Sequence, residues 1–326
     1  MTSYLIRRLL GLIPVLLGIT LLSFGVMKLA PGEPTDAALQ FNPKASVEAR
    51  ARIEKLLGLD QPVHVQYLHW LGRLGRLDFG RSFLDGRAVK DKIFERLPIT
   101  LGINAAAIAL VLLLAIPLGV VAAARPGTWF DRGMTLLVFI GYSMPSFWLA
   151  LIAISVFGVQ LRWLPVSGLH SLDYEALAWP ARWLDTIRHL VVPVGIMTFT
   201  GLAGISRYVR ASMREVLEQD YIRTARAKGL SEQRVLFHHG LRNGLLPMIT
   251  LLGLMLPAFI SGSVIMETIF SIPGMGRLFY EAVIARDDYV VMALVTIGGM
   301  LTLLGNVLAD LAYAWADPRI RVGRPQ

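Results

Sequence analysis

The stretch DYIRTARAKGLSEQRVLFHHGLRNGLLP, residues 220–247, is a polar and basic block that separates two apolar segments of the chain. Each flanking segment is long enough to cross a membrane as a helix. A membrane protein that inserts a long, basic, helix-forming segment between two spans presents that segment to something outside the lipid. The block is therefore the first candidate for a functional site.

The composition predicts an integral membrane protein. Hydrophobic residues make up 55% of the 326 residues and charged residues 17%, compared with ~45–50% and ~25% in soluble domains. Apolar runs of the ~17–25 residues that span a bilayer as a helix occur six times. They are Leu9–Leu29, Ile99–Ala124, Met134–Val159, Leu190–Ile205, Leu245–Ile272 and Val290–Ala314. We therefore expect an all-α membrane protein with six transmembrane helices.

Two of these runs differ from a simple span. The first follows Arg7-Arg8 like a secretory signal, but it exceeds the ~7–15 apolar residues of a signal peptide, so we keep it as a helix. The fourth is short, and residues 204–218 can continue its helix beyond the membrane. This extension places three arginines on one face, where they could anchor to lipid phosphates or bind acids of a partner. They are Arg207, Arg210 and Arg214.

Charge sets the expected orientation. The loops 1–8, 125–132, 207–246 and 315–326 hold 15 basic residues, whereas the short loops 160–189 and 273–289 hold 5. Because basic loops stay in the cytoplasm, both termini and the block are predicted to be cytoplasmic. The expected divisions are 1–29, an extracytoplasmic loop 30–98, a core 99–314 and a cytoplasmic tail 315–326. The basic balance reflects topology, so nucleic acid is not an expected partner.

The long outer loop is predicted to contain two short helices. Ser46 is a plausible N-cap for a helix to about Leu57, which Gly58 would end. A second helix from about Val63 carries an apolar stripe. The stripe consists of Tyr67, Trp70, Leu71 and Leu74. This helix either lies in the membrane interface or packs on other protein.

The groups needed for most enzyme chemistry are missing from the sequence. There are no cysteines, none of the six lysines follows a glycine as in a phosphate-binding P-loop, and no HExxH pair is present. We expect no catalytic, metal or cofactor site. Glu267 and Asp310 lie inside apolar runs, where acids are costly and often functional. Both are within about a turn of a span's end, which favours capping or hydration over a proton relay.

The block itself has the pattern of a helix, a break and a second helix. Gly229 after Lys228 fits a left-handed C-cap, and Ser231 offers a hydroxyl to the next helix. The first helix follows the spacing of Tyr221, Thr224, Ala225 and Lys228. The second, from about Glu232, is expected to place three residues on one side, and Pro247 marks the entry into the fifth span. The three are Val235, Leu236 and His239.

The block resembles the EAA signature of the permease subunits of bacterial ABC importers. The core reads Thr224-Ala225-Arg226-Ala227-Lys228-Gly229, with Leu246-Pro247 downstream, although Thr224 stands where the general pattern has glutamate. Residues 221–230 look like the variant found in the dipeptide, oligopeptide and nickel branch. The runs ETIFSIPGMG at 267–276 and LAYAWADPRIR at 311–321 match that branch as well. The opening at 4–9, with Pro31-Gly32 after the first span, resembles its B-type subunit.

The resemblance implies a type I importer fold in a bacterial inner membrane and a set of partner proteins. These would be a second, C-type permease subunit, two cytoplasmic ATPase subunits that hold ATP-Mg, and an extracytoplasmic substrate-binding protein. The block would supply the coupling helix that docks on an ATPase subunit. The residues that match the motif region are Thr224, Ala225, Arg226, Ala227, Lys228, Gly229, Leu230, Ser231, His238, Leu241 and Pro247.

Within that set, close docking is expected from four residues and charge pairing from Arg226. The four are Ala225, Ala227, Gly229 and Leu230. The substrate stays open among di- and oligopeptides, nickel chelates and oligosaccharides. An alternative is an ion-coupled secondary transporter or channel that uses Glu267 or Asp310, which would need no ATPase. An intramembrane enzyme would require a nucleophile, base and metal set that the sequence lacks.

Overall fold

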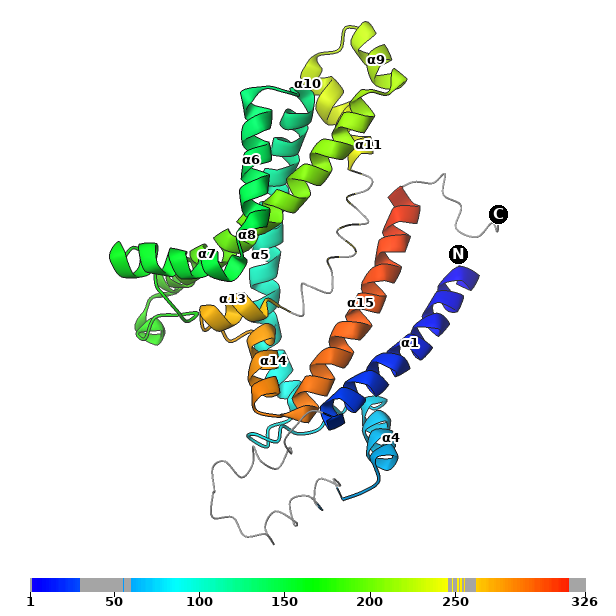
Figure 1. The fold of residues 1–326 in the computed structure, drawn as a ribbon, viewed down its shortest axis with the longest axis vertical. Helices are drawn as coiled ribbons and strands as arrows, with labels where there is room; N and C mark the ends of the chain where they lie inside the picture. The colour runs from blue at the N-terminus through cyan, green and yellow to red at the C-terminus, as the bar shows by residue number, and fades with distance from the viewer. Residues whose placement is uncertain are drawn as a thin grey trace. The chain divides into compact units, whose positions relative to one another are not determined.

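The computed structural model describes residues 2–29, 55, 60–245, 248, 251, 253, 255 and 262–316, and the elements named below lie in these ranges. Every named element is helical, which confirms the predicted all-α class. The chain forms two compact units. Unit 1 comprises residues 1–100, 260–264 and 273–304, and unit 2 comprises residues 101–259, 265–272 and 305–326. Figure 1 labels the helices of both.

Unit 1 is built from α1 (Thr2–Leu29), α4 (Val63–Leu74), the start of α5 (Val89–Ala124), α14 (Met275–Ile284) and most of α15 (Asp288–Ala316). Helix α4 packs on α1. The rings of Phe24 and Tyr67 meet edge to face at 5.4 Å, the Tyr67 hydroxyl is 3.0 Å from Thr20 Oγ1, and Trp70 is buried. Of the two placements expected for this amphipathic helix, packing on protein is the one observed.

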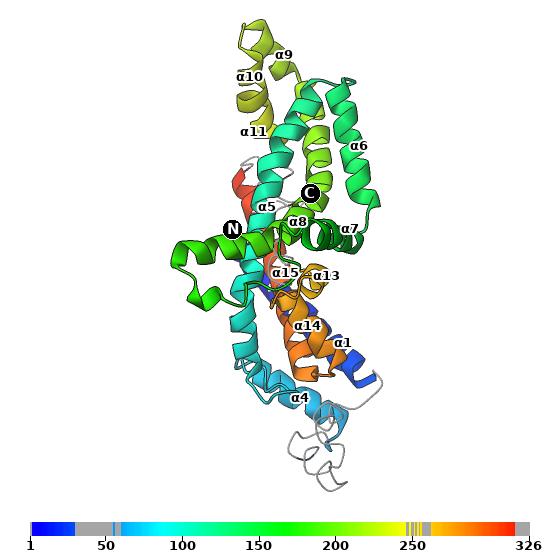
Figure 2. The same cartoon turned by 90° about the vertical axis from the view of Figure 1, so that its left-hand side faces the viewer.

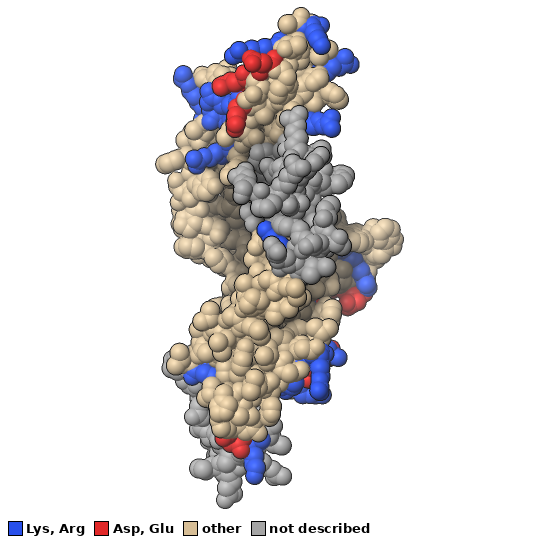
Figure 3. Space-filling view, turned by 90° about the vertical axis from the view of Figure 1, so that its right-hand side faces the viewer, with Lys and Arg blue, Asp and Glu red and all other residues tan. Residues whose placement is uncertain are grey.

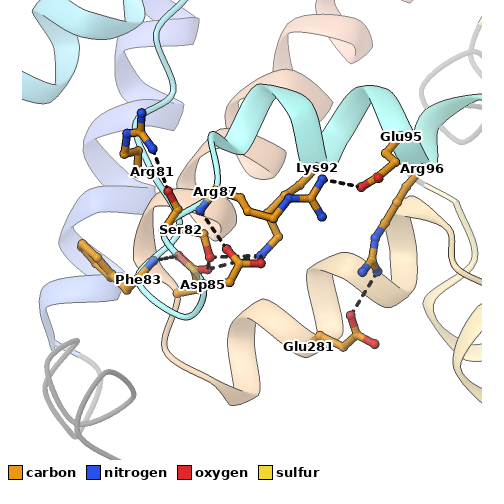
Figure 4. Close-up of polar contacts among 11 residues, drawn as sticks. Arg81, Ser82, Phe83, Asp85, Arg87, Lys92, Glu95, Arg96 and Glu281 are labelled. Atoms are coloured by element: carbon orange, nitrogen blue, oxygen red, sulfur yellow. Dashed lines mark hydrogen bonds and ion pairs between the residues drawn. The ribbon is translucent and has the colours of Figure 1, made fainter. Parts of the chain in front are cut away.

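A polar network joins the start of α5 to the loop before α15 within unit 1 (Figure 4). The Lys92 ammonium, which is buried, donates to Asp85 Oδ2 at 3.0 Å and to Ser82 Oγ at 3.0 Å. Ser82 donates in turn to the buried carboxylate of Asp287. Burying a lysine is costly unless it is paired. The network supplies that pairing and holds the hairpin-like turn at 81–88 against α5.

Unit 2 contains the rest of α5, α6 (Trp129–Ser143), α7 (Ser146–Ala153) with its π-helical extension Ile154–Gln160, α8 (Trp179–Leu217) and α13 (Val264–Ile269). Its core lies between α5 and α8 (Figure 2). Val120, Val209 and Met213 are fully buried there. At Gly119 an added Cβ would lie 2.7 Å from Val209 Cβ, so the glycine allows the two helices to approach closely.

The third predicted span is not one straight helix. Helices α6 and α7 meet at an angle of 95°. Met144 is extended, with φ −91° and ψ 121°, because a residue before proline disfavours the α region. Pro145 is the N-cap residue of α7, which begins at Ser146. The prediction of a continuous helix over Met134–Val159 was therefore wrong.

Four of the described helices are long and apolar enough to cross a membrane, or five if α6 and α7 form one broken span. Helix α8 continues to Leu217, which confirms the predicted extension of the fourth helix. Helix α14 falls in a segment for which no helix was predicted. Part of the fifth predicted span, including residues 256–261, lies outside the described residues, as do the predicted helix at 46–57, except residue 55, Pro247 and the Asp310 side chain.

Candidate functional site

The polar block folds as a set of short helices at the end of α8 (Figures 1 and 2). Gln219 is extended, with ψ 148°, and separates α8 from α9 (Asp220–Ala227). After a turn, the chain forms α10 (Glu232–Arg234), a π-helical segment Val235–Gly240 and α11 (Leu241–Gly244). The predicted helix, break and second helix is confirmed, except that the second helix is three pieces rather than one.

Gly229 makes the break. Its φ is +75°, in the left-handed region that residues with a side chain rarely adopt. The Gly229 N–H donates to Arg226 O at 2.9 Å, and the Leu230 N–H donates to Ala225 O at 3.4 Å. These two bonds form a Schellman motif, the usual glycine-dependent end of a helix. The predicted role of Gly229 as a left-handed C-cap is confirmed.

The interior of the block fixes which side of α9 is hidden. Ile222, Ala225 and Val235 are buried together, and Leu217 and Leu230 pack against them. Ala225 was expected at a docking surface, yet its side chain fills this interior and holds α9 on the π-helical segment. Leu230 is half-buried for the same reason, since the residue after a glycine cap normally packs back on its helix.

Two details of the second helix differ from the prediction. Ser231 has extended backbone and its carbonyl accepts from the Val235 N–H at 3.0 Å, but its side chain makes no capping hydrogen bond. The π-helical turns shift the buried face, so that Val235, Leu236 and Gly240 are buried whereas His239 is only half-buried. His238 is exposed, and Leu241 packs against the core of unit 2.

The block is fastened to α8 by glycines that face Met213. An added Cβ would lie 3.0 Å from Met213 Cε at Gly240 and 2.6 Å from Met213 Sδ at Gly244. Ser212 Oγ donates to Gly244 O at 2.9 Å, which ties the same turn of α8 to α11. Within the block, Asn243 Nδ2 donates to the Tyr221 hydroxyl at 2.9 Å and links α11 to α9. These contacts leave little free space between the block and the end of α8.

The exposed side of the block is small and charged. Thr224, Ala227, Lys228 and Gly229 are exposed, and charged side chains gather at this end of unit 2 (Figure 3). Arg226 binds Glu232 with two bonds, Nη2 to Oε1 at 2.7 Å and Nε to Oε2 at 3.2 Å. The hydrogen bonds from Arg226 lower the pKa of Glu232, and those to Glu232 raise the pKa of Arg226. Arg226 therefore has a partner within the block.

The sequence prediction missed the residues that fasten the block to its helix. Met213 lies outside the motif region, and Gly240 and Gly244 were not singled out. Their spacing of four residues places two small side chains on one helical face, which is the pattern that permits close packing of helices. That spacing was the available signal. No sequence signal predicted the hydrogen bond between Tyr221 and Asn243, because it depends on the angle between α9 and α11.

The described helices define a membrane protein with several apolar helices and a packed polar block. The family described as the inner membrane component of binding-protein-dependent transport systems matches residues 115–322, and its N-terminal component matches residues 1–104. The chain belongs to this family of transport permeases. It is 47% identical over 321 residues to the oligopeptide transport system permease protein AppB of Bacillus subtilis, covering 98% of this chain and 99% of the relative.

A second relative is the di/tripeptide transport system permease protein DppB of Pseudomonas aeruginosa. The two sequences are 39% identical over 337 residues, which cover 98% of this chain and 99% of the relative. Both matches extend over nearly the whole length of each protein. The family is named for dependence on a binding protein, so the permease works as one component of a larger transport system.

Proposed function

We propose that the chain is the B-type permease subunit of an ATP-driven importer that carries di- or oligopeptides across the bacterial inner membrane. Support for the substrate class comes from the relatives, which are named as oligopeptide and di/tripeptide transport permeases. In this proposal six spans form a type I importer core over 99–314 together with the first helix. Both termini and the block lie in the cytoplasm, the segment 30–98 lies outside, and the tail begins near residue 315.

The block is the proposed coupling element. The observation that carries this role is the two-sided construction of the block. One side, at Gly240 and Gly244, is packed on Met213 of α8 without free space. The other side exposes Ala227, Lys228 and Gly229, whose small or flexible side chains allow another protein surface to approach closely. A push on the exposed side is transmitted to α8, a single helix of 39 residues.

The proposed partners follow from that role. The chain would pair with a C-type permease subunit, and two ATPase subunits would bind ATP-Mg and undergo ATP-driven closure. An extracytoplasmic binding protein would deliver the peptide. Closure of the ATPase pair would shift the block and α8, and thereby switch the spans between inward- and outward-facing states. This chain then carries no nucleotide and performs no hydrolysis.

Purification of the tagged chain from mild detergent tests the proposal. Mass spectrometry of the co-purified proteins should identify a second permease and a P-loop ATPase, and the assembly should hydrolyse ATP faster when a peptide-loaded binding protein is added. Recovery of the chain alone, as an oligomer indifferent to ATP, would overturn the proposal and direct attention to Glu267, which is buried in α13.

A further inference from the structure

Unit 2 contains a cavity that belongs neither to the block nor to its contact with Met213. It has a volume of about 280 Å³ and lies between α5, α6 and α8. Gly119 and Ala122 line it from α5, Val138 and Phe139 from α6, and Arg207 from α8. All of these residues belong to unit 2 and to helices, or bent helix pairs, that are apolar and long enough to cross a membrane.

The cavity wall is apolar on most sides, with polar groups at α8 and at Thr135 and Tyr142 of α6. Ser206 is buried there, and its Oγ has no hydrogen-bond partner within the part of the chain that the structure describes. Arg210 is neutralised by Asp131, with Nε 2.6 Å from Oδ1 and Nη2 2.8 Å from Oδ2. Arg207 is exposed, and among the described residues no hydrogen bond or ion pair holds its side chain. One uncompensated positive charge therefore lies at the rim of an apolar cavity.

The outer face beside the cavity is also apolar. On α6, Leu136, Phe139 and Tyr142 each expose more than half of their surface. A helix, ~10–12 Å across, cannot enter a volume of about 280 Å³. Part of an acyl chain can, because a cavity of ~150 Å³ already admits benzene. The combination of an apolar cavity and a free arginine on one rim matches a molecule with an aliphatic chain and an anionic head.

We propose that this cavity binds an anionic phospholipid. Part of one acyl chain occupies the space between α5, α6 and α8, and Arg207 binds the phosphate. With the orientation proposed above, the lipid comes from the cytoplasmic leaflet, where long arginine side chains reach the headgroups. The lipid would fill the gap on the side of α8 that the block does not cover.

Photolabelling of the full chain, in the assembly with which it co-purifies, tests this site. The probe is phosphatidylglycerol with a photoreactive acyl chain, added to phosphatidylcholine nanodiscs, and labelled peptides are mapped by mass spectrometry. Labelling is expected at residues 134–142 of α6. Arg207→Gln should lower it roughly fivefold, which corresponds to about 1 kcal/mol per basic side chain at an anionic surface. Val138→Phe, which fills the cavity from its wall, should lower it as well.

Two matched variants serve as controls. Arg132→Gln removes an exposed arginine from the start of α6, and Leu136→Phe enlarges an exposed side chain of the same helix. Neither residue lines the cavity. Both should label like the wild type. A photoreactive phosphatidylcholine should label more weakly than the phosphatidylglycerol probe, and added inorganic phosphate should not displace the latter.

Three results would overturn the proposal. Equal labelling by both lipids, unchanged in Arg207→Gln, would show that the cavity has no headgroup preference. Displacement by inorganic phosphate would identify a free-anion site instead. An unlabelled wild type, together with loss of another permease subunit from the Val138→Phe assembly, would identify the cavity as part of a subunit interface.

Discussion

Arg226 and Glu232 face each other across the turn that Gly229 makes, with Nη2 of Arg226 2.7 Å from Oε1 of Glu232. The pair joins the end of α9 to the start of α10. Arg226 was expected to pair with a charged residue of a partner, but its guanidinium is already bound within the block. Any partner acid that binds Arg226 must therefore compete with Glu232 or share the guanidinium with it.

The first prediction concerns the pH dependence of this pair. Because Arg226 lowers the pKa of Glu232 in the fold, the pair stabilises the block above the ordinary glutamate pKa of 4.5. The stabilisation is lost as pH falls through the lowered folded-state pKa. Glu232→Gln should remove it at neutral pH, at a cost of about 0.2–1 kcal/mol because both side chains are partly exposed. Hydrogen exchange of the peptide 226–235 measures the effect.

The control for this pair is Arg223→Gln. Arg223 Nη1 is 3.3 Å from Asp220 Oδ1, and the two side chains are 73% and 94% exposed. Such a pair contributes almost nothing, so the exchange of the block should not change. If exchange in wild type and Glu232→Gln followed the same course from neutral to acid pH, the Arg226–Glu232 bond would be irrelevant to the turn.

Substitution of Gly229 is the second prediction. An added Cβ would meet nothing within 4 Å, but the φ of +75° strains any other residue. Gly229→Val should cost about 1–2 kcal/mol and reduce the stimulation of ATP hydrolysis by loaded binding protein, while membrane insertion persists. Gly229→Asn should be much milder, because asparagine tolerates this region best among residues with side chains. Normal stimulation in Gly229→Val would exclude a coupling role for the turn.

The third prediction tests the contact between α8 and α11. Gly244→Ala places a methyl group 2.6 Å from Met213 Sδ, and overpacking of this kind costs about 1–3 kcal/mol. The melting temperature in detergent should fall, and ATPase coupling should fall with it. In a Met213→Ala background the same substitution should cost less stability, since the stability effects of substitutions at two contacting residues do not simply add.

Gly133→Ala provides the comparison for this contact, because nothing lies within 4 Å of a Cβ at that helical position. It should leave the melting temperature unchanged or raise it. If Gly244→Ala lowered the melting temperature equally with and without Met213, the two residues would not interact.

The fourth prediction concerns the buried network of unit 1. Lys92→Met leaves Asp287, which is 1% exposed, without its cationic neighbour. Breaking a buried charge pair in this way costs about 3–5 kcal/mol, so thermal unfolding of the purified chain should occur at a much lower temperature. Arg87→Gln removes a cation whose pair with Glu95 is more than half exposed, and it should have little effect. Comparable shifts for the two variants would contradict the assigned role of Lys92.

Much of the fold could be predicted because its signals are local. The positions of α1 and α15 follow from apolar runs, and the end of α9 follows from Gly229, since few other residues adopt its backbone conformation. Helix α8 begins at Trp179, well before its apolar run at Leu190, in a segment predicted to be a loop. The bend between α6 and α7 also had a local signal, Pro145, but the surrounding run is apolar throughout and hides the break. Hydropathy measures length and polarity, and it does not measure direction.

The candidate site was harder to predict because exposure depends on distant packing. Ala225 and Ala227 belong to the same motif and have the same side chain, yet only Ala227 is exposed. The difference arises because Val235 and Leu217 cover one face of α9. The π-helical turns at 235–240 place Val235 against α9, and no sequence pattern predicted these turns. A motif locates a docking segment, but the fold decides which of its residues a partner can reach.

Disulfide cross-linking at these two alanines tests the coupling claim most directly. The chain has no cysteines, so Ala227→Cys introduces a single thiol on the exposed side of the block, and Ala225→Cys introduces one in its interior. In the assembled transporter, Ala227→Cys should cross-link to a cysteine placed in the ATPase subunit, with a yield that changes when ATP binds, and Ala225→Cys should not. An active assembly in which Ala227→Cys never cross-links to the ATPase subunit would contradict the account.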